Sequence, residues 1–203
     1  MRIEILVEEQ SAEEALRHLL PKLLQNRAQA KVINLGSKHK LLKLLPERVA
    51  AYAQRIASGE SLRVVVLVDR DHDDCEALKA GLERVAAGAG LLTKSAAAAG
   101  QAFAVLNRIV VEELESWFIG DPSALCRAFT GLPRASTHSG IFRNPDNGGS
   151  WEALHRFLKR HGIYKNSFPK IDAARRIAPH MDVGQNRSRS FQVFVEGMDA
   201  LLE

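Results

Sequence analysis

The sequence predicts an α/β protein with a mostly parallel four-stranded sheet flanked by helices, followed by a helical and basic C-terminal segment. Strand-like and helix-like patterns alternate in the order β-α-β-α-β-α-β, which favours parallel strands joined by helical crossovers. Residues 62–68, LRVVVLV, are apolar almost throughout, as in a strand buried on both faces. After Asp121 the composition changes, and a stretch rich in glycine, proline and serine precedes short helical patterns.

The first half of the chain contains the elements of this sheet. Ser11 and Glu14 have the spacing of a capping box, which predicts a helix start, and the leucines that follow recur at helical spacing. Gly36 interrupts the second apolar strand pattern before a helix rich in leucine, alanine and arginine. These patterns predict strands over residues 2–7, 30–35, 62–68 and 102–111, and helices over roughly 11–26, 38–57, 73–87 and 112–119.

The second half begins with residues 131–150, whose glycines, prolines and serines predict a long irregular loop. Helical patterns follow over residues 151–161, 169–179 and 188–202. We therefore expect an α/β domain over residues 1–130, with a loop and helical segment, residues 131–203, packed on it.

Length and composition are those of an ordinary globular protein. The chain has 203 residues, enough for one domain with a sizeable core, and 46% of them are hydrophobic and 26% charged. No apolar run is long enough to span a bilayer, and acidic residues interrupt the first apolar stretch, unlike in a signal peptide. Cys75 and Cys126 do not form a cysteine-based metal motif. We expect a cytoplasmic protein with reduced thiols and no membrane association.

The basic residues are concentrated in the second half. The net charge is +4, and the interval from Arg134 to Arg189 holds 11 basic residues and 4 acidic ones. This excess predicts a polyanionic partner such as the phosphate backbone of a nucleic acid; a solvated basic face without a partner is an equal alternative. The candidate backbone contacts are Lys159, Arg160, Lys165, Arg175, Arg176, Arg187 and Arg189.

Acidic residues follow three of the predicted strands. Glu8 follows the first strand, Asp69 and Asp71 follow the third, and Glu113 and Glu115 follow the fourth. In the commonest arrangement of such a sheet the first and third strands are neighbours, so the carboxyl ends of the strands bring these acids to one edge. Crowded carboxylates repel each other unless solvent or a cation offsets their charge, and Mg²⁺ or Mn²⁺ prefers oxygen ligands of this kind.

The acids of VDRDHDD, residues 68–74, have different expected roles. Asp69 and Asp71 are two residues apart, so an extended backbone directs both to the same side. Asp74 is expected at the start of the next helix, where a negative charge interacts favourably with the helix dipole. Asp73 is compatible with either role, and we keep it as a candidate metal ligand.

The segments VEEQSAEEAL, VDRDHDD and VEELESWFIGD resemble the Toprim domain, in the version found in a bacterial family of unknown function (domain of unknown function 4276). That family is related to the Toprim nuclease domains of overcoming-lysogenization-defect proteins. The Toprim pattern, a glutamate after strand 1 and Asp-x-Asp after strand 3, matches Glu8, Asp69 and Asp71. Near the C-terminus, YKNSFPKIDAARRI and SRSFQVFVEGMDAL are similar to the closing helices of the bacterial family, so the resemblance covers nearly the whole chain.

The resemblance implies a Toprim-like fold and a metal-dependent nuclease, a hydrolase of nucleic acids. Glu8, Asp69 and Asp71 would hold Mg²⁺ or Mn²⁺, and Glu113 or Glu115 would complete a second metal site or act as general base. It also implies a possible partner, an ATPase of the ABC/SMC type encoded nearby, and a role in phage defence.

The alternative function is a catalytically inactive Toprim-like module that binds nucleic acid or protein. Two departures from the family pattern favour this alternative. Glu9 replaces the family's glycine, and Ala12 replaces its second glutamate. Glycine would allow close approach of a metal or phosphate to the backbone; Glu9 either hinders that approach or supplies an extra ligand.

Overall fold

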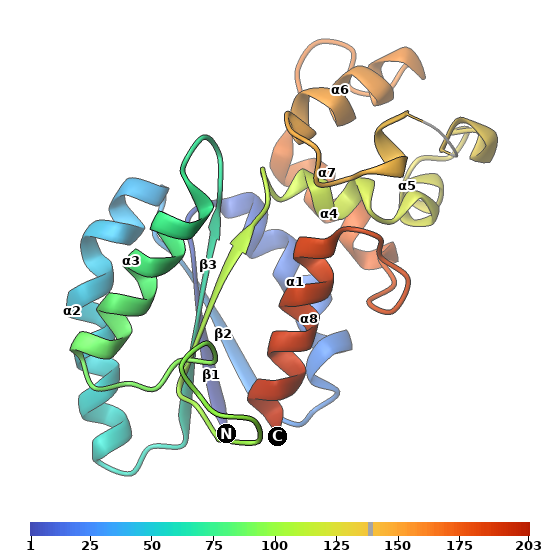
Figure 1. Ribbon diagram of the computed structural model, residues 1–203. Coiled ribbons are helices and arrows are strands. Elements are labelled where there is room, and N and C mark those ends of the chain that lie inside the picture. The colour runs from blue at the N-terminus through green and yellow to red at the C-terminus, as the bar shows by residue number, and fades with distance from the viewer. Residues whose placement is uncertain (138–139) are drawn as a thin grey trace.

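The four strands form one parallel sheet in the order β2-β1-β3-β4. The structure is a computed structural model, which describes residues 1–137 and 140–203. The central position of β1 beside β3 confirms the predicted arrangement and places the carboxyl ends of all four strands at one edge (Figure 1). The strands are β1 (Arg2–Val7), β2 (Gln29–Asn34), β3 (Leu62–Asp69) and β4 (Val105–Val110).

Helices cover both faces of the sheet. In Figure 1, α2 (Lys38–Ala57) and α3 (Cys75–Gly88) lie on one face, while α1 (Gln10–Leu24) and α8 (Arg189–Leu202) lie on the other. The side chains of β3 alternate between the two resulting cores: Val65 packs in one and Val66 in the other. This two-sided burial explains why β3 is apolar almost throughout, and it confirms the predicted α/β architecture.

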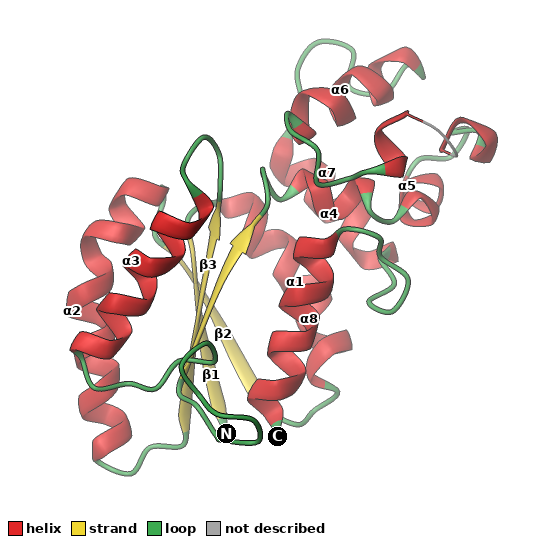
Figure 2. Cartoon of the chain, viewed as in Figure 1, coloured by secondary structure: helices red, strands yellow, loops and turns green. Residues whose placement is uncertain are grey.

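A group of short helices lies beyond the carboxyl ends of the strands (Figure 2). It consists of α4 (Glu115–Ile119), α5 (Pro122–Ala128), α6 (Ser150–Arg160) and α7 (Lys170–Ile177). The sequence patterns did not predict α5, although its start has a recognisable signal: the Asp121 side chain accepts a hydrogen bond from the backbone of Ala124 at 2.9 Å, and Pro122 occupies the first turn.

The predicted loop over residues 131–150 contains two short 3-10 helices, Arg134–Thr137 and Gly140–Arg143. Residues 138–139 of this loop lie outside the described residues. The rest of the loop leads into α6, which begins one residue earlier than predicted.

The C-terminal segment returns to the sheet through a buried polar junction. Trp117 Nε1 donates a hydrogen bond to Ser190 Oγ at 3.1 Å, and Asn186 Nδ2 donates to the Trp117 carbonyl at 2.8 Å. A Cβ atom at Gly120 would lie 2.1 Å from Asn186 Oδ1, so only glycine permits this approach. The junction brings α8 against β4 and α1. The division of the chain at residue 130 stays a prediction.

None of the helices within residues 1–137 and 140–203 has the length and apolar character needed to cross a membrane.

Candidate active site at the carboxyl edge of the sheet

Carboxylates from three strand ends meet at the carboxyl edge of the sheet. Glu8 follows β1, and its Oε1 accepts a hydrogen bond from the backbone N–H of Asp69 at 2.5 Å, which ties the ends of β1 and β3 together. Asp69 is the last residue of β3 and pairs in register with Val110, the last residue of β4. Glu115 opens α4, just after β4. The sheet order therefore brings together acids that are more than a hundred residues apart in the sequence.

Burial changes the acidity of these carboxylates. Burial, followed by the charges of Glu8 and Glu115, raises the pKa of Asp69 well above its usual range. The Glu115 residue is 0% exposed, and burial raises its pKa to about 7 although Lys170 opposes the shift. Burial likewise raises the pKa of Glu8 to about 7. Glu8 and Glu115 can therefore exchange protons near neutral pH, as general acids and bases do.

Glu115 is poorly compensated in this site. Neither of its carboxylate oxygens makes a hydrogen bond to another residue that the structure describes, although both are buried. The Lys170 ammonium lies 3.9 Å from Glu115 Oε2, too far for a good hydrogen bond. A buried carboxyl without partners is costly to ionise, and a bound cation or ligand would reduce that cost.

Lys170 places a positive charge among the acids. Its Nζ lies 3.5 Å from Glu113 Oε1 and 3.8 Å from Glu9 Oε1, in addition to its contact with Glu115. Burial opposes its charge, but Glu115, Glu9 and Glu113 raise the pKa of Lys170 above its usual range. The ammonium therefore offsets part of the repulsion that we expected solvent or a metal ion to offset.

Lys38, at the start of α2, offsets the charge of the acids on the loop after β3 in the same way. Its Nζ donates hydrogen bonds to the Asp69 carbonyl at 2.6 Å and to Asp71 Oδ2 at 3.1 Å, and it lies 2.7 Å from Asp73 Oδ2. Asp71 has a φ of 50°, because β3 ends at Asp69 and the chain turns immediately. The alternation expected from Asp69 to Asp71 therefore does not continue, and Asp71 and Asp73 both pair with Lys38. Asp74 caps α3 through the Ala77 N–H, as predicted.

Sequence reasoning missed both lysines, although each leaves a faint signal. Lys38 is the first residue of α2 and Lys170 is the first residue of α7. The helix dipole disfavours a cation at a helix N-terminus. A lysine in this position therefore suggests that acidic groups from another part of the fold lie nearby.

The start of α6 is attached to the same edge. The backbone N–H of Trp151 and the hydroxyl of Ser150 approach Glu113 Oε2 at 3.3 and 3.4 Å. Glu112 forms an ion pair with Arg70 and accepts a hydrogen bond from the Gly149 N–H at 3.2 Å. The residues around Glu113 thus connect β4, the loop after β3 and the long loop that precedes α6.

The donor set fits a hard divalent cation in its chemistry. Glu8, Asp69 and Glu115 supply only carboxylate oxygens, and Glu115 has no other hydrogen-bond partners within the described chain. However, in the parts of the chain that the structure describes, no three His, Cys, Asp or Glu side chains are arranged to hold a metal ion. Coordination of Mg²⁺ or Mn²⁺ therefore requires these side chains to rearrange.

The predicted basic residues are all exposed, but some of them already have a partner within the protein and others do not. Arg175 Nε lies 3.1 Å from Oε1 of the buried Glu14, and Arg189 Nη1 lies 2.8 Å from Glu196 Oε1. The Arg176 guanidinium stacks 4.3 Å above the Phe129 ring. The remaining four make no ion pair with any described residue: Lys159, Arg160, Lys165 and Arg187. These four are the most available for a polyanion.

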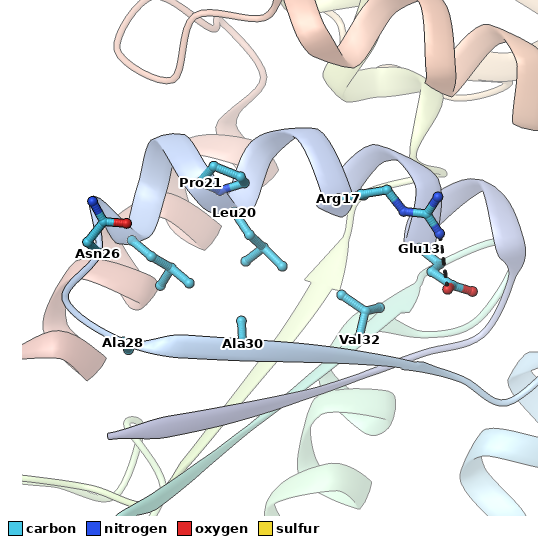
Figure 3. Close-up of a pocket in the computed structure, with 9 residues that line it drawn as sticks. Glu13, Arg17, Leu20, Pro21, Asn26, Ala28, Ala30 and Val32 are labelled. Atoms are coloured by element: carbon cyan, nitrogen blue, oxygen red, sulfur yellow. Dashed lines mark ion pairs between the residues drawn. The ribbon is translucent and has the colours of Figure 1, made fainter.

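A groove of about 420 Å³ lies elsewhere, between α1 and the edge strand β2 (Figure 3). Leu20, Ala30 and Val32 give it an apolar floor, and the ion pair between Glu13 and Arg17 closes one end. It contains none of the predicted site residues, so we assign the chemistry to the acidic edge instead.

Comparison with known proteins identifies one family. The sequence pattern of the domain of unknown function DUF4276 matches residues 7–199. No curated protein sequence matches the chain. Among solved structures, the C-terminal region of the Xanthomonas campestris pv. campestris OLD protein is similar over 98% of this chain and 95% of that chain, with 15% sequence identity and a TM-score of 0.48.

Proposed function

The chain belongs to the DUF4276 family, a family of unknown function, and we propose that it is a metal-dependent phosphodiesterase that cleaves nucleic acid. The observation that carries the proposal is the buried Glu115, with two unpartnered oxygens, beside Glu8 and Asp69, whose pKa values are raised like its own. Acids with raised pKa values at the carboxyl edge of a parallel sheet are typical of a catalytic site.

In this proposal the acids have two tasks. Glu8 and Asp69, with Asp71 or Asp73, would hold Mg²⁺ or Mn²⁺, which when bound polarises a phosphate and activates a water. Glu115 or Glu113 would accept a proton, since a pKa of about 7 at Glu115 suits a general base at neutral pH. The Lys170 ammonium would face the negative charge of the phosphate. The resemblance to Toprim nucleases supports this proposal. We include in it what the resemblance implies, namely an ATPase partner of the ABC/SMC type and a role in phage defence.

Metal binding is expected to depend on Asp69 and on pH. Asp69→Asn should weaken binding of Mn²⁺ strongly in calorimetric titration, because an amide is a poor ligand for a hard cation. Wild-type affinity should increase as the pH rises through about 7, because Glu8 and Glu115 must lose their protons before they can ligate. Glu47→Gln, at an exposed position on α2, serves as the control. Equal binding by wild type and Asp69→Asn would place the metal elsewhere.

The exposed basic residues are expected to bind the phosphate backbone of a nucleic acid. Lys159→Glu combined with Arg160→Glu should reduce nucleic-acid affinity and its salt dependence. The melting temperature should fall only slightly, because both side chains are exposed and unpaired within the described chain, although the C-terminal end of α6 favours cations. Arg175→Glu should instead lower the melting temperature, since it sets a like charge beside the buried Glu14. Filter-binding assays at several salt concentrations and thermal melts distinguish the two effects. Unchanged affinity in the double variant would remove α6 from the interface.

The second candidate is a non-catalytic binding module. It is favoured by Lys170, whose ammonium already lies among the carboxylates that a metal ion would need. This candidate predicts no divalent-dependent cleavage of plasmid, single-stranded DNA or RNA, either by the chain alone or with an ATPase encoded nearby. Cleavage by either preparation would exclude it.

A further inference from the structure

Three aromatic side chains form a cluster beside the acidic site. Trp151 and His155 lie on α6, and Phe168 lies just before α7; all three are partly exposed. Their ring centroids are 5.7 to 6.5 Å apart, and the planes of Trp151 and His155 differ by 18°. A hydrogen bond between His155 Nε2 and the Tyr164 carbonyl, 2.8 Å long, fixes the orientation of the histidine. We call these three side chains the aromatic cluster.

The main core does not account for Trp151. Among the described hydrophobic residues that pack on that core, Phe168 and Tyr164 are included whereas Trp151 is not. The second tryptophan, Trp117, shows the contrast, because it is 0% exposed and packs against Phe191 and Phe194. A tryptophan ring kept partly in solvent forgoes the stabilisation that burial would give, which suggests a role in binding.

Glu113 links the aromatic cluster to the acidic site. Glu113 Oε2 accepts the backbone N–H of Trp151 at 3.3 Å, and Glu113 Oε1 lies 3.5 Å from Lys170 Nζ. Lys170 is two residues after Phe168 in the sequence. Glu113 therefore joins the backbone at Trp151 to the acidic site.

The aromatic cluster has acidic neighbours at the site itself and basic neighbours along α6 and after it. Lys159 continues the helical stripe of Trp151 and His155 at four-residue spacing, and Arg156 and Lys165 are exposed nearby in the sequence. A surface that combines flat aromatic rings with cations complements a ligand that combines flat rings with anions. An unpaired nucleotide has both, since its base can stack on an aromatic ring while its phosphate contacts a lysine or arginine.

We propose that Trp151, supported by His155 and Phe168, is a stacking platform for an unpaired base, so that the nucleic acid recognised at the acidic site is single-stranded. This inference rests on the proposed function and specifies its substrate class. In a duplex the bases are stacked on each other and are not available to the platform, whereas the phosphates remain available to the lysines and arginines.

The test separates base stacking from phosphate contacts. Three ligands are compared in EDTA, where no metal-dependent cleavage occurs: a short oligothymidylate, an abasic strand with the same number of phosphates, and a duplex of equal length. We expect wild type to bind the oligothymidylate on the order of tenfold more tightly than the abasic strand. Trp151→Ala should remove this difference and leave affinity for the abasic strand unchanged, while Trp151→Phe should retain part of it.

Intrinsic fluorescence gives a second readout. Trp117 is buried, so quenching by the oligothymidylate should come from Trp151 and disappear in Trp151→Phe. His161→Ala is the matched control, because His161 contacts Phe157 on another face of α6. If Trp151→Ala lost affinity equally for the oligothymidylate and the abasic strand, or for neither, the stacking platform would be overturned. The nuclease proposal would then still stand. Failure of wild type to bind any of the three ligands would overturn the platform, whereas the nuclease proposal is tested separately by cleavage in Mn²⁺.

Discussion

Glu8→Gln is expected to lower divalent-dependent cleavage by more than about 100-fold while the fold stays intact. Loss of residues that merely support a metal ligand typically costs about 10- to 100-fold, so loss of a ligand should cost at least as much. Glutamine keeps the shape of the side chain, and its amide oxygen can still accept the hydrogen bond from the Asp69 N–H. An amide, however, is a far poorer ligand than a carboxylate for a hard cation.

The measurement is cleavage of single-stranded and plasmid DNA and of RNA in Mg²⁺ and Mn²⁺, with circular dichroism to verify the fold. Glu9→Gly is the informative companion, because it restores the glycine that the Toprim pattern has at this position; we expect its activity to be unchanged or higher. If Glu8→Gln cleaves as fast as wild type, the metal is not bound at this edge. If wild type cleaves nothing in Mn²⁺, even with a nearby ATPase, the enzyme proposal fails and the fold assignment is unaffected.

Glu115→Gln is expected to raise the melting temperature in EDTA at pH 8. The pKa of Glu115 is about 7 in the folded protein, against 4.5 for an ordinary glutamate. Below pH 4.5 both states hold the proton. Between pH 4.5 and 7 the unfolded chain releases it while the folded protein retains it, so stability falls as the pH rises, and above pH 7 the loss is complete. This pKa shift corresponds to a loss of folding stability on the order of 3 kcal/mol.

Thermal melts between about pH 4 and 8 measure this effect as the difference between wild type and Glu115→Gln. The curves should converge at low pH and separate as the pH rises, because glutamine does not titrate. Glu47→Gln, which alters an exposed carboxylate, should follow wild type throughout. A melting temperature lowered by Glu115→Gln at every pH would mean that Glu115 is a structural partner of Lys170 rather than an uncompensated acid.

The strands themselves followed from local patterns in the sequence, and the convergence of the acids followed from the commonest arrangement of such a sheet, which puts β1 beside β3. The apolar run of β3 is long because both of its faces are buried, so periodicity alone identified it. Acids directly after parallel strands must meet at the carboxyl edge, whatever side chains surround them. Glu8, Asp69, Glu113 and Glu115 could therefore be assigned to one edge of the sheet from their positions in the sequence.

Three features depended on contacts between residues distant in the sequence. Lys170 lies 55 positions after Glu115 in the chain, and only the packing of α7 against α1 brings its ammonium to the acids. The turn after β3, with a φ of 50° at Asp71, directs Asp71 and Asp73 to Lys38, which strand alternation could not anticipate. The exposure of Trp151 was equally unpredictable, because the same helical pattern fits a tryptophan in the core.

The sequence by itself determined the α/β architecture and which acids share an edge, because both follow from periodicity and from the common direction of parallel strands. Only the tertiary structure decided which of those acids have partners. Charge compensation and burial depend on which side chains are in contact in the folded protein, and the spacing of residues in the sequence does not reveal those contacts. The physical consequence is clear at Glu115, where complete burial and distance from a hydrogen-bonding partner raise the pKa to about 7.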